Sequence, residues 1–323
     1  MQFDVHTKWS YTPVREEMPR SVIHIGANKT GSTTLQRCIF ATSEGLVYLG
    51  EDCAGYENYR DFLNSLVSDD DFHFDYERTS EIFKELMSAC GEKTFLYSNE
   101  DIMTSRVPSQ CARRLYQFLP EAEILMVVRN QLTAIPSFYA NHGAYLKMVP
   151  QKYWRRYVSF GDWMSYCTEF IKYSPLDSYF YNKILRLYTS LFGREKIHVL
   201  LYEDFVNVKV KFVEDLCGIL RIDKEEALRH LQGRRERRRN TQREFRYHQF
   251  RTLFLKGRSF GGRLPFGAAL RRIWRRFLEG GPPADGFMSD EWRNRIVELY
   301  KEDNMKLAKE YHLPLKKLNY PMP

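Results

Sequence analysis

One stretch of the chain, residues 21–36 with the sequence SVIHIGANKTGSTTLQ, restricts the fold more than any other. Residues 22–25 form a short apolar run typical of a buried strand, and a helix-like segment follows Gly31. Between them, Gly26 and Gly31 allow the backbone to curl until several amide N–H groups face one point. The N-terminus of the following helix adds positive potential at that point. The stretch therefore predicts a strand–loop–helix unit that binds an anion.

The loop departs from a Walker A phosphate loop in the position of its lysine. Gly26 and Gly31 match the spacing G-x-x-x-x-G, but Ser32 and Thr33 follow where Lys and then Ser or Thr are expected. A glycine loop alone is often an ordinary tight turn, whereas a lysine inside the loop and hydroxyls after it favour anion binding. The predicted anion ligands are Lys29, Thr30, Gly31, Ser32, Thr33 and Thr34.

Four apolar runs rich in β-branched residues alternate with helical patterns along the chain. This alternation predicts an α/β class, with a three-layer, P-loop-like fold whose central parallel sheet is flanked by helices. We expect one domain over residues 1–323, with a core at about 20–220 and a basic helical C-terminal portion at about 221–323. Ligands of such sheets collect at the carboxyl ends of the strands. The predicted strands are 21–26, 93–98, 123–128 and 196–202, and the predicted helices are 32–42, 77–90, 108–118, 134–147, 177–192 and 208–220.

A second anion site is predicted after the strand at 123–128. Arg129 follows this strand directly, and Ser137 in the next helix can reach the same place, with Pro136 accepted in a first helical turn. A guanidinium and a hydroxyl together suit a phosphate. The alternative is an arginine that only pairs with a neighbouring carboxylate. Combined with the glycine loop, the pair predicts a nucleotide that carries phosphates at two separated places.

The strand at 93–98 is followed by Glu100 and Asp101. Glu100 is suited to act as a general base that takes a proton from an attacking hydroxyl, and the alternative is an N-cap carboxylate for the next helix. Asp101 is interpreted as a solvated or capping residue. Tyr202 and Glu203, after the last strand, are interpreted as structural residues.

Composition excludes several classes of protein. The six cysteines lack CxxC spacing and the eight histidines form no HExxH motif, so we expect neither a disulfide framework nor a metal site. No apolar run is long enough to cross a bilayer, and the first 20 residues lack the apolar region of a secretory signal. These features predict a cytoplasmic protein, although the luminal part of a Golgi-type anchored chain would have the same composition. The formal charge is +8, and residues 221–280 hold 18 Lys and Arg against 6 Asp and Glu. Such a region is either a solvated surface or an anion site.

These residues together resemble the sulfotransferases that use 3'-phosphoadenosine 5'-phosphosulfate (PAPS), of the bacterial or carbohydrate type. Residues 29–35 are similar to the family's 5'-phosphosulfate loop, and residues 128–139 are similar to its 3'-phosphate segment, with the family's spacing from Arg129 to Ser137. Residues 95–101, 160–163 and 176–205 resemble further landmarks, so that the resemblance covers about residues 20–220.

The resemblance implies a role for each candidate. Lys29 would bind the bridging oxygen and the transferred sulfuryl group, Glu100 would deprotonate the acceptor, and PAPS would be the co-substrate with no metal required. A sulfuryl group carries less charge than a phosphoryl group, so a cation and oriented amides suffice to stabilise the leaving phosphate. The resemblance leaves two positions open. The third 3'-phosphate contact is one of Arg239, Arg243, Arg246, Lys256 or Arg258, and the residue that stacks on adenine is Tyr48 or Phe245.

The acceptor is a hydroxyl or amine, and we expect a saccharide or glycolipid, in view of the aromatic residues at 152–163 and the basic region. His142 and Tyr139 are candidates for binding it; His142 is also an alternative base or a packed histidine. Two rival functions are a P-loop kinase and a basic nucleic-acid-binding module. A P-loop kinase would need a lysine after Gly31 and an aspartate at a strand end, and this sequence has neither. A nucleic-acid-binding module would give the glycine loop no role. We expect no nucleic-acid partner and predict no oligomeric state.

Overall fold

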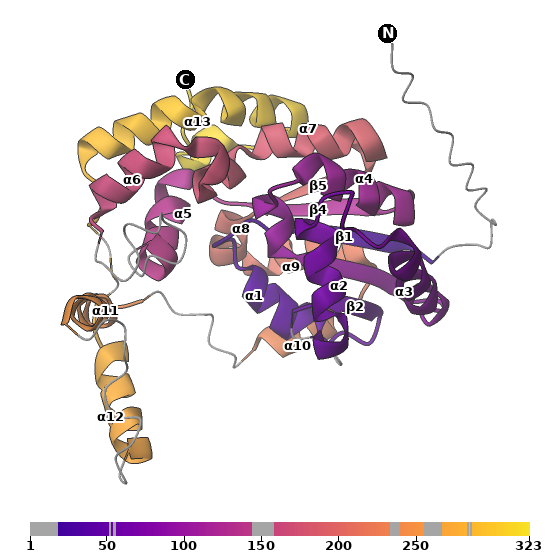
Figure 1. Cartoon of the computed structure of the whole chain (residues 1–323), viewed down its shortest axis with the longest axis horizontal. Coiled ribbons are helices and arrows are strands. Elements are labelled where there is room, and N and C mark those ends of the chain that lie inside the picture. Colours follow the sequence, from indigo (N-terminus) through magenta and orange to yellow (C-terminus); the bar gives the residue numbers. More distant parts are fainter. Residues whose placement is uncertain are drawn as a thin grey trace.

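The computed structural model describes residues 19–51, 53, 56–143, 158–232, 240–254, 267–282, 284 and 286–323. Its centre is a sheet of five parallel strands in the order β2-β3-β1-β4-β5 (Figure 1). The predicted α/β class with a central parallel sheet flanked by helices is therefore confirmed. The strands are β1 (Ser21–Ile25), β2 (Leu46–Gly50), β3 (Thr94–Asn99), β4 (Glu123–Val128) and β5 (Ile197–Leu201).

Strand β2 was not expected from the sequence. It lies at the edge of the sheet, pairs only with β3 among the described strands, and two of its five side chains are half-buried. Its short apolar run, LVYLG, gives little periodicity, and its place depends on pairing with a strand almost 50 residues away. An edge strand of this kind is defined by its partner more than by its own sequence.

Alternation of side chains along the strands produces two hydrophobic layers. Ile23 and Ile25 enter one core cluster, whereas Val22 enters the other. Helices α2, α3, α4 and α7 cover the first face, and α1, α9 and α10 cover the second (Figure 1). The helices are α1 (Ser32–Leu35), α2 (Tyr56–Ser68), α3 (Tyr76–Ser88), α4 (Pro108–Phe118), α5 (Gln131–Phe138), α6 (Phe160–Glu169), α7 (Tyr181–Phe192), α8 (Tyr202–Asn207), α9 (Lys209–Leu220), α10 (Lys224–Leu231), α11 (Gln242–Phe254), α12 (Gly267–Glu279) and α13 (Asp290–Tyr311).

The helix predicted at 134–147 was wrong at its start. Helix α5 begins at Gln131 because the side chain of Asn130 caps it by accepting a hydrogen bond from the N–H of Leu132. Pro136 therefore lies inside the helix rather than in its first turn. Beyond α5 the chain continues in a π-helical turn, Tyr139–Gly143, and residues 144–147 lie outside the described residues.

The helix predicted at 177–192 also begins later than expected. Short 3-10 turns occupy Ile171–Tyr173 and Pro175–Tyr179, and α7 starts at Tyr181. Pro175 and the side chain of Ser174, which accepts from the N–H of Leu176, stabilise a separate turn at this place.

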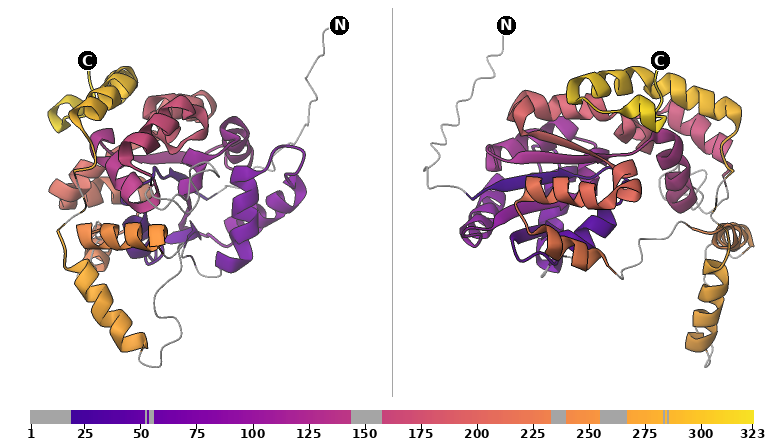
Figure 2. Two further views of the ribbon diagram at one scale, coloured as in Figure 1. Left: turned by 60° about the vertical axis from the view of Figure 1, so that its left-hand side comes forward. Right: turned by 180° about the vertical axis from the view of Figure 1, so that it is seen from behind.

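The C-terminal helix α13 packs against α5 and α7, so the last part of the chain joins the sheet-bearing body. Asn304 of α13 and Gln131 of α5 exchange two hydrogen bonds between their buried side-chain amides. By contrast, α12 extends away from the body in all three views (Figures 1 and 2). Among the described residues, no helix has the length and apolar character needed to cross a membrane.

Candidate active site

The glycine loop lies between β1 and α1, as its sequence predicts, and two of its residues have left-handed backbone. Gly31 has φ 86° and Lys29 has φ 70°. A left-handed lysine is uncommon, so the surrounding contacts must hold this conformation. The hydroxyl of Thr30 donates to the carbonyl of Ala27 at 2.6 Å and stabilises the turn from within. The helix that follows starts at Ser32, and its first amides point toward the loop.

Gly26 is required because three side chains crowd its Cα. A Cβ atom at this position would lie 2.9 Å from the hydroxyl of Ser32 and 3.2 Å from Cγ of Glu100. It would also lie 3.2 Å from the ring of His24. The missing side chain thus lets Glu100, from the end of β3, lie directly over the start of the loop.

Arg129 follows β4, the neighbour of β1, and its side chain is almost fully buried at 4% exposure. One guanidinium nitrogen donates to the carbonyl of Lys29 at 2.7 Å, and Nε donates to the hydroxyl of Thr133 at 3.0 Å. The guanidinium also lies 4.5 Å from the ring centre of Tyr202. None of these partners is a carboxylate. Arg129 therefore links the glycine loop to the first turns of α5.

The start of α5 is fixed from two sides. The N–H of Asn130 donates to the carboxylate of Glu203 at 3.0 Å, and the hydroxyl of Tyr320 donates to the other oxygen of that carboxylate at 2.7 Å. The side-chain amide of Asn130 donates to the carbonyls of Leu318 and Asn319. Glu203 thus has the structural part assigned to it from sequence, and the C-terminal tail supports the strand end that carries Arg129.

Glu100 is half-buried at the end of β3. Burial and the negative charge of Glu51 raise its pKa to about 7 from the usual 4.5, against the opposing effects of a hydrogen bond from Ser32 and the charge of Lys29. The N-cap of the following turn is Asn99, whose side chain accepts from the N–H of Asp101 at 2.8 Å. The alternative in which Glu100 is the N-cap is therefore wrong.

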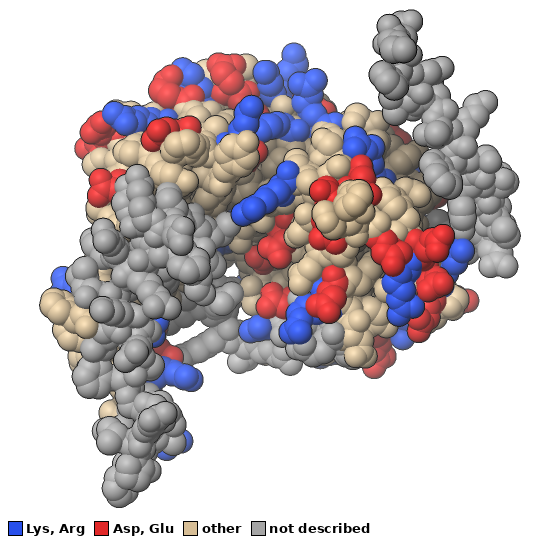
Figure 3. Space-filling view, viewed as in Figure 1, with Lys and Arg blue, Asp and Glu red and all other residues tan. Residues whose placement is uncertain are grey.

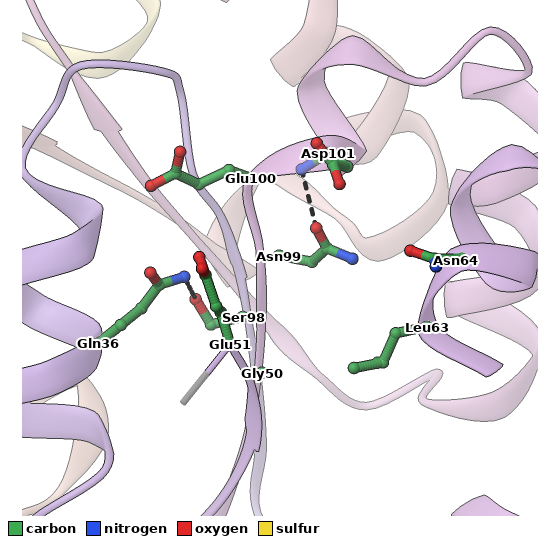
Figure 4. Close-up of a pocket in the computed structure, with 9 residues that line it drawn as sticks. All are labelled: Gln36, Gly50, Glu51, Leu63, Asn64, Ser98, Asn99, Glu100 and Asp101. Atoms are coloured by element: carbon green, nitrogen blue, oxygen red, sulfur yellow. Dashed lines mark hydrogen bonds between the residues drawn. The ribbon is translucent and has the colours of Figure 1, made fainter. Parts of the chain in front are cut away.

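A cavity of about 230 Å³ opens beside Glu100 (Figure 4). Asn64 and Leu63 enter it from α2, on the opposite side from Gln36 of the π-helical turn after α1. The wall is rich in carboxylates and amides, the groups that bind sugar hydroxyls by hydrogen bonds. The lining residues are Gln36, Gly50, Glu51, Leu63, Asn64, Ser98, Asn99, Glu100 and Asp101.

A buried polar group that the sequence did not predict includes Ser98 and Gln36 of the cavity wall. Nδ1 of His24 lies 2.8 Å from the hydroxyl of Ser98, which accepts a hydrogen bond from the amide of Gln36 at 3.1 Å. Burial lowers the pKa of His24 to about 4, so the imidazole is neutral at pH 7. A polar residue in the middle of the apolar run at 22–25 was the only signal for this group.

Ser137 is half-buried on α5, one turn after Thr133, and both line a second cavity of about 260 Å³. Arg293 of α13 and Asn240 also line this cavity. Since Arg129 contacts Thr133, the guanidinium lies between the glycine loop and this second cavity. Ser137 and Arg129, the two residues predicted to form one anion site, are connected here through Thr133, which accepts from Arg129 and lines the cavity with Ser137.

Tyr139 is fully buried, and its hydroxyl donates to the carbonyl of Val158 at 2.6 Å. Its ring packs on Phe160 and Phe287, so the side chain belongs to the core rather than to a pocket wall. The backbone of His142 lies in the π-helical turn after α5, and its side chain lies outside the described residues.

The candidates for further nucleotide contacts are dispersed. Arg243 donates to the carbonyl of Phe277 and stacks on its ring, and Arg246 is exposed on α11. Phe245 is buried against Tyr139 and Phe287, and Tyr48 is half-buried on β2. Arg239, Lys256 and Arg258 lie outside the described residues. No cluster of three or more His, Cys, Asp or Glu side chains suited to a metal ion occurs within the described ranges.

Comparison with solved structures connects this architecture to sulfotransferases. The chain is similar to a sulfotransferase from Alicyclobacillus acidocaldarius, with a TM-score of 0.52 and 17% identity over 93% of this chain and 98% of that one. It is also similar to the sulfotransferase domain of the Synechococcus PCC 7002 olefin synthase, with a TM-score of 0.44, 14% identity and coverage of 93% and 97%. No family model and no curated protein matches the sequence. The likeness at 17% identity shows a sulfotransferase-type fold.

Proposed function

We propose that the protein transfers a sulfuryl group from PAPS to a hydroxyl, or an amine, of an acceptor. The observation that carries this proposal is the position of Arg129. Its guanidinium joins the carbonyl of Lys29, in a loop suited to one anionic group, to Thr133, beside a cavity suited to another. A nucleotide with a 5'-phosphosulfate and a separate 3'-phosphate requires two such places.

The donor set fits the anionic ends of PAPS. At the 5' end, the loop offers the Lys29 ammonium, the hydroxyls of Thr33 and Thr34, and the amides around Gly31 at the start of a helix. The buried hydroxyls of Thr30 and Ser32 already bond to Ala27 and Glu100, so these two residues shape the loop and contribute through their backbone. At the 3' end, Ser137, Thr133 and the cationic Arg293 line one cavity. Arg293 is therefore our candidate for the third 3'-phosphate contact, in place of the residues at 239–258.

Each residue has a chemical task in this proposal. PAPS supplies an activated sulfuryl group whose bond to the 5'-phosphate breaks as the acceptor oxygen bonds to sulfur. Glu100 takes the proton from the acceptor hydroxyl, and a pKa of about 7 makes its carboxylate a stronger base than an ordinary glutamate. Lys29 stabilises the negative charge that develops on the leaving phosphate, and Arg129 holds the loop in the left-handed conformation that places Lys29.

The cavity beside Glu100 indicates what kind of acceptor fits. Glu51, Asn64 and Asp101 surround the catalytic carboxylate with hydrogen-bond acceptors and one amide donor. These carboxylates would repel an acceptor that is anionic near its reacting hydroxyl. We therefore propose a saccharide or glycolipid whose reacting sugar is uncharged or carries an amine.

The test is sulfuryl transfer from sulfur-labelled PAPS to a panel of saccharides, glycolipids and phenols, together with calorimetric binding of adenosine 3',5'-bisphosphate without metal. We expect labelling of a neutral or amino sugar, and near-complete loss of transfer in Lys29→Ala and in Arg129→Ala. Retention of PAPS-dependent transfer by either variant would refute the proposed roles. Magnesium-dependent transfer from ATP would instead identify a kinase.

A further inference from the structure

Helices α11 and α12 form a pair that is anchored at one end to the rest of the chain. Thr241 and Glu244 make reciprocal hydrogen bonds that cap α11, each side chain accepting from the backbone N–H of the other. The hydroxyl of Thr241 also donates to the carbonyl of Leu278 in α12. The N–H of Gln242 donates to Pro282 at 2.8 Å, which closes the base of the pair. The two helices are thus fixed relative to each other while α12 extends away from the body (Figures 1 and 2).

The pair exposes several large apolar side chains among the described residues of both helices. In α12, Ile273 is 65% exposed, Trp274 is 49% exposed and Phe277 is 51% exposed. In α11, Phe254 is 70% exposed and packs on the half-exposed Phe250 with ring centres 5.0 Å apart. Trp274 contacts α11 through Tyr247, at 5.9 Å between ring centres, so the two helices contribute to one surface. Several such side chains together indicate a binding surface rather than scattered exposure.

Basic residues flank these apolar side chains. In the sequence of α12, GAALRRIWRRFLE, the apolar positions 270, 273, 274, 277 and 278 follow helical spacing, and the four arginines fall between them. Arg272, Arg275 and Arg276 are exposed. Residues 242–279 hold ten Lys and Arg against two Glu, and this excess of eight equals the formal charge of the whole chain, +8. On the face that Figure 3 shows, charges of both signs are interspersed over the body.

We propose that the α11–α12 pair binds the surface of a membrane that contains anionic lipids. An amphipathic helix with Trp, Phe and Ile on one face and arginines beside them lies in the membrane interface, with its apolar face among the lipid chains and its cations among the headgroups. At 13 residues, α12 is about 20 Å long, so it would lie in the interface rather than span the bilayer. A nucleic acid would use the arginines but would leave Ile273 and Phe254 in water. The apolar and cationic groups together therefore favour a lipid surface.

The experiment is co-sedimentation of the full chain with vesicles of phosphatidylcholine alone and of phosphatidylcholine mixed with phosphatidylserine. We expect binding to the mixed vesicles and much weaker binding to the neutral ones. Arg272→Gln with Arg275→Gln should lower partitioning roughly 30-fold, from about fivefold, or about 1 kcal/mol, for each arginine near an anionic surface. Phe254→Gln with Ile273→Gln should lower it roughly tenfold or more, because these side chains lose apolar contact with lipid.

The matched control is Arg113→Gln with Arg229→Gln, which removes two exposed arginines from α4 and α10 and should leave partitioning unchanged. Trp274 gives a second measurement, since its fluorescence should shift to shorter wavelength with mixed vesicles and the shift should vanish in Trp274→Phe. Circular dichroism of each variant confirms folding. The proposal would be overturned by equal binding to both vesicle types or by an equal loss of partitioning in the control variant. It would also be overturned if the fluorescence of Trp274 did not shift. Binding of a DNA duplex that depends on these arginines, together with no binding to either vesicle type, would also overturn it.

Discussion

Replacement of Glu100 by Gln tests the environment of the proposed base through both activity and stability. Burial and Glu51 raise the pKa of this carboxyl from the usual 4.5 to about 7. Because the pKa is higher in the folded than in the unfolded chain, the folded state holds the proton more tightly, and this group lowers the free energy of unfolding as pH rises from 4.5 to 7. The difference between the two pKa values corresponds to about 3 kcal/mol, lost in full above pH 7.

Glu100→Gln removes this titration while keeping the size and hydrogen-bonding capacity of the side chain. Urea unfolding should therefore show little difference between the variant and the parent protein at pH 4.5, and a variant more stable by up to about 3 kcal/mol at pH 8. Sulfuryl transfer should be lost at both pH values. In the parent protein, the rate should be half-maximal near pH 7 and fall about tenfold for each pH unit below it.

Glu51→Gln separates the two causes of the raised pKa. Glu51 is exposed and its charge is the second cause after burial, so its removal should move the half-maximal pH of the rate to a lower value while activity above pH 7 persists. Two outcomes would refute the reasoning. One is a Glu100→Gln variant whose free energy of unfolding has the same pH dependence as that of the parent protein. The other is a Glu51→Gln variant in which the half-maximal pH of the transfer rate is unchanged.

Two further substitutions test the geometry of the loop. Gly26→Ala places a methyl group 2.9 Å from the hydroxyl of Ser32 and 3.2 Å from Cγ of Glu100. We therefore expect urea unfolding to show a loss of about 1–3 kcal/mol in the free energy of unfolding, together with a larger fractional loss of the transfer rate. An unchanged rate would contradict the crowded geometry. Arg129→Lys keeps the charge but not the planar fork, which donates to the carbonyl of Lys29 and to α5 at once. Calorimetry should show weaker binding of adenosine 3',5'-bisphosphate by roughly tenfold or more, and parent-like affinity would mean that charge alone suffices.

The sequence by itself determined the units of this fold. Each of the four predicted strands carries its own apolar run, and the glycine loop carries its own turn-forming residues, so local chemistry was sufficient to place them. The same local information placed Lys29, Glu100 and Arg129 just after three of the predicted strands. It failed for β2, whose position depends on pairing with β3, and for the start of α5, where one capping side chain decided the first residue.

Only the tertiary structure decided how these units meet. Arg129 and Lys29 are 100 residues apart in sequence, and their hydrogen bond exists because β1 and β4 are neighbours in the sheet. The wall contributed by Asn64, the support of α5 by Tyr320, and the raised pKa of Glu100 likewise arise from contacts between distant segments. Periodicity and turn chemistry describe a chain over one element at a time, whereas burial and the field at a carboxyl group depend on everything packed around it.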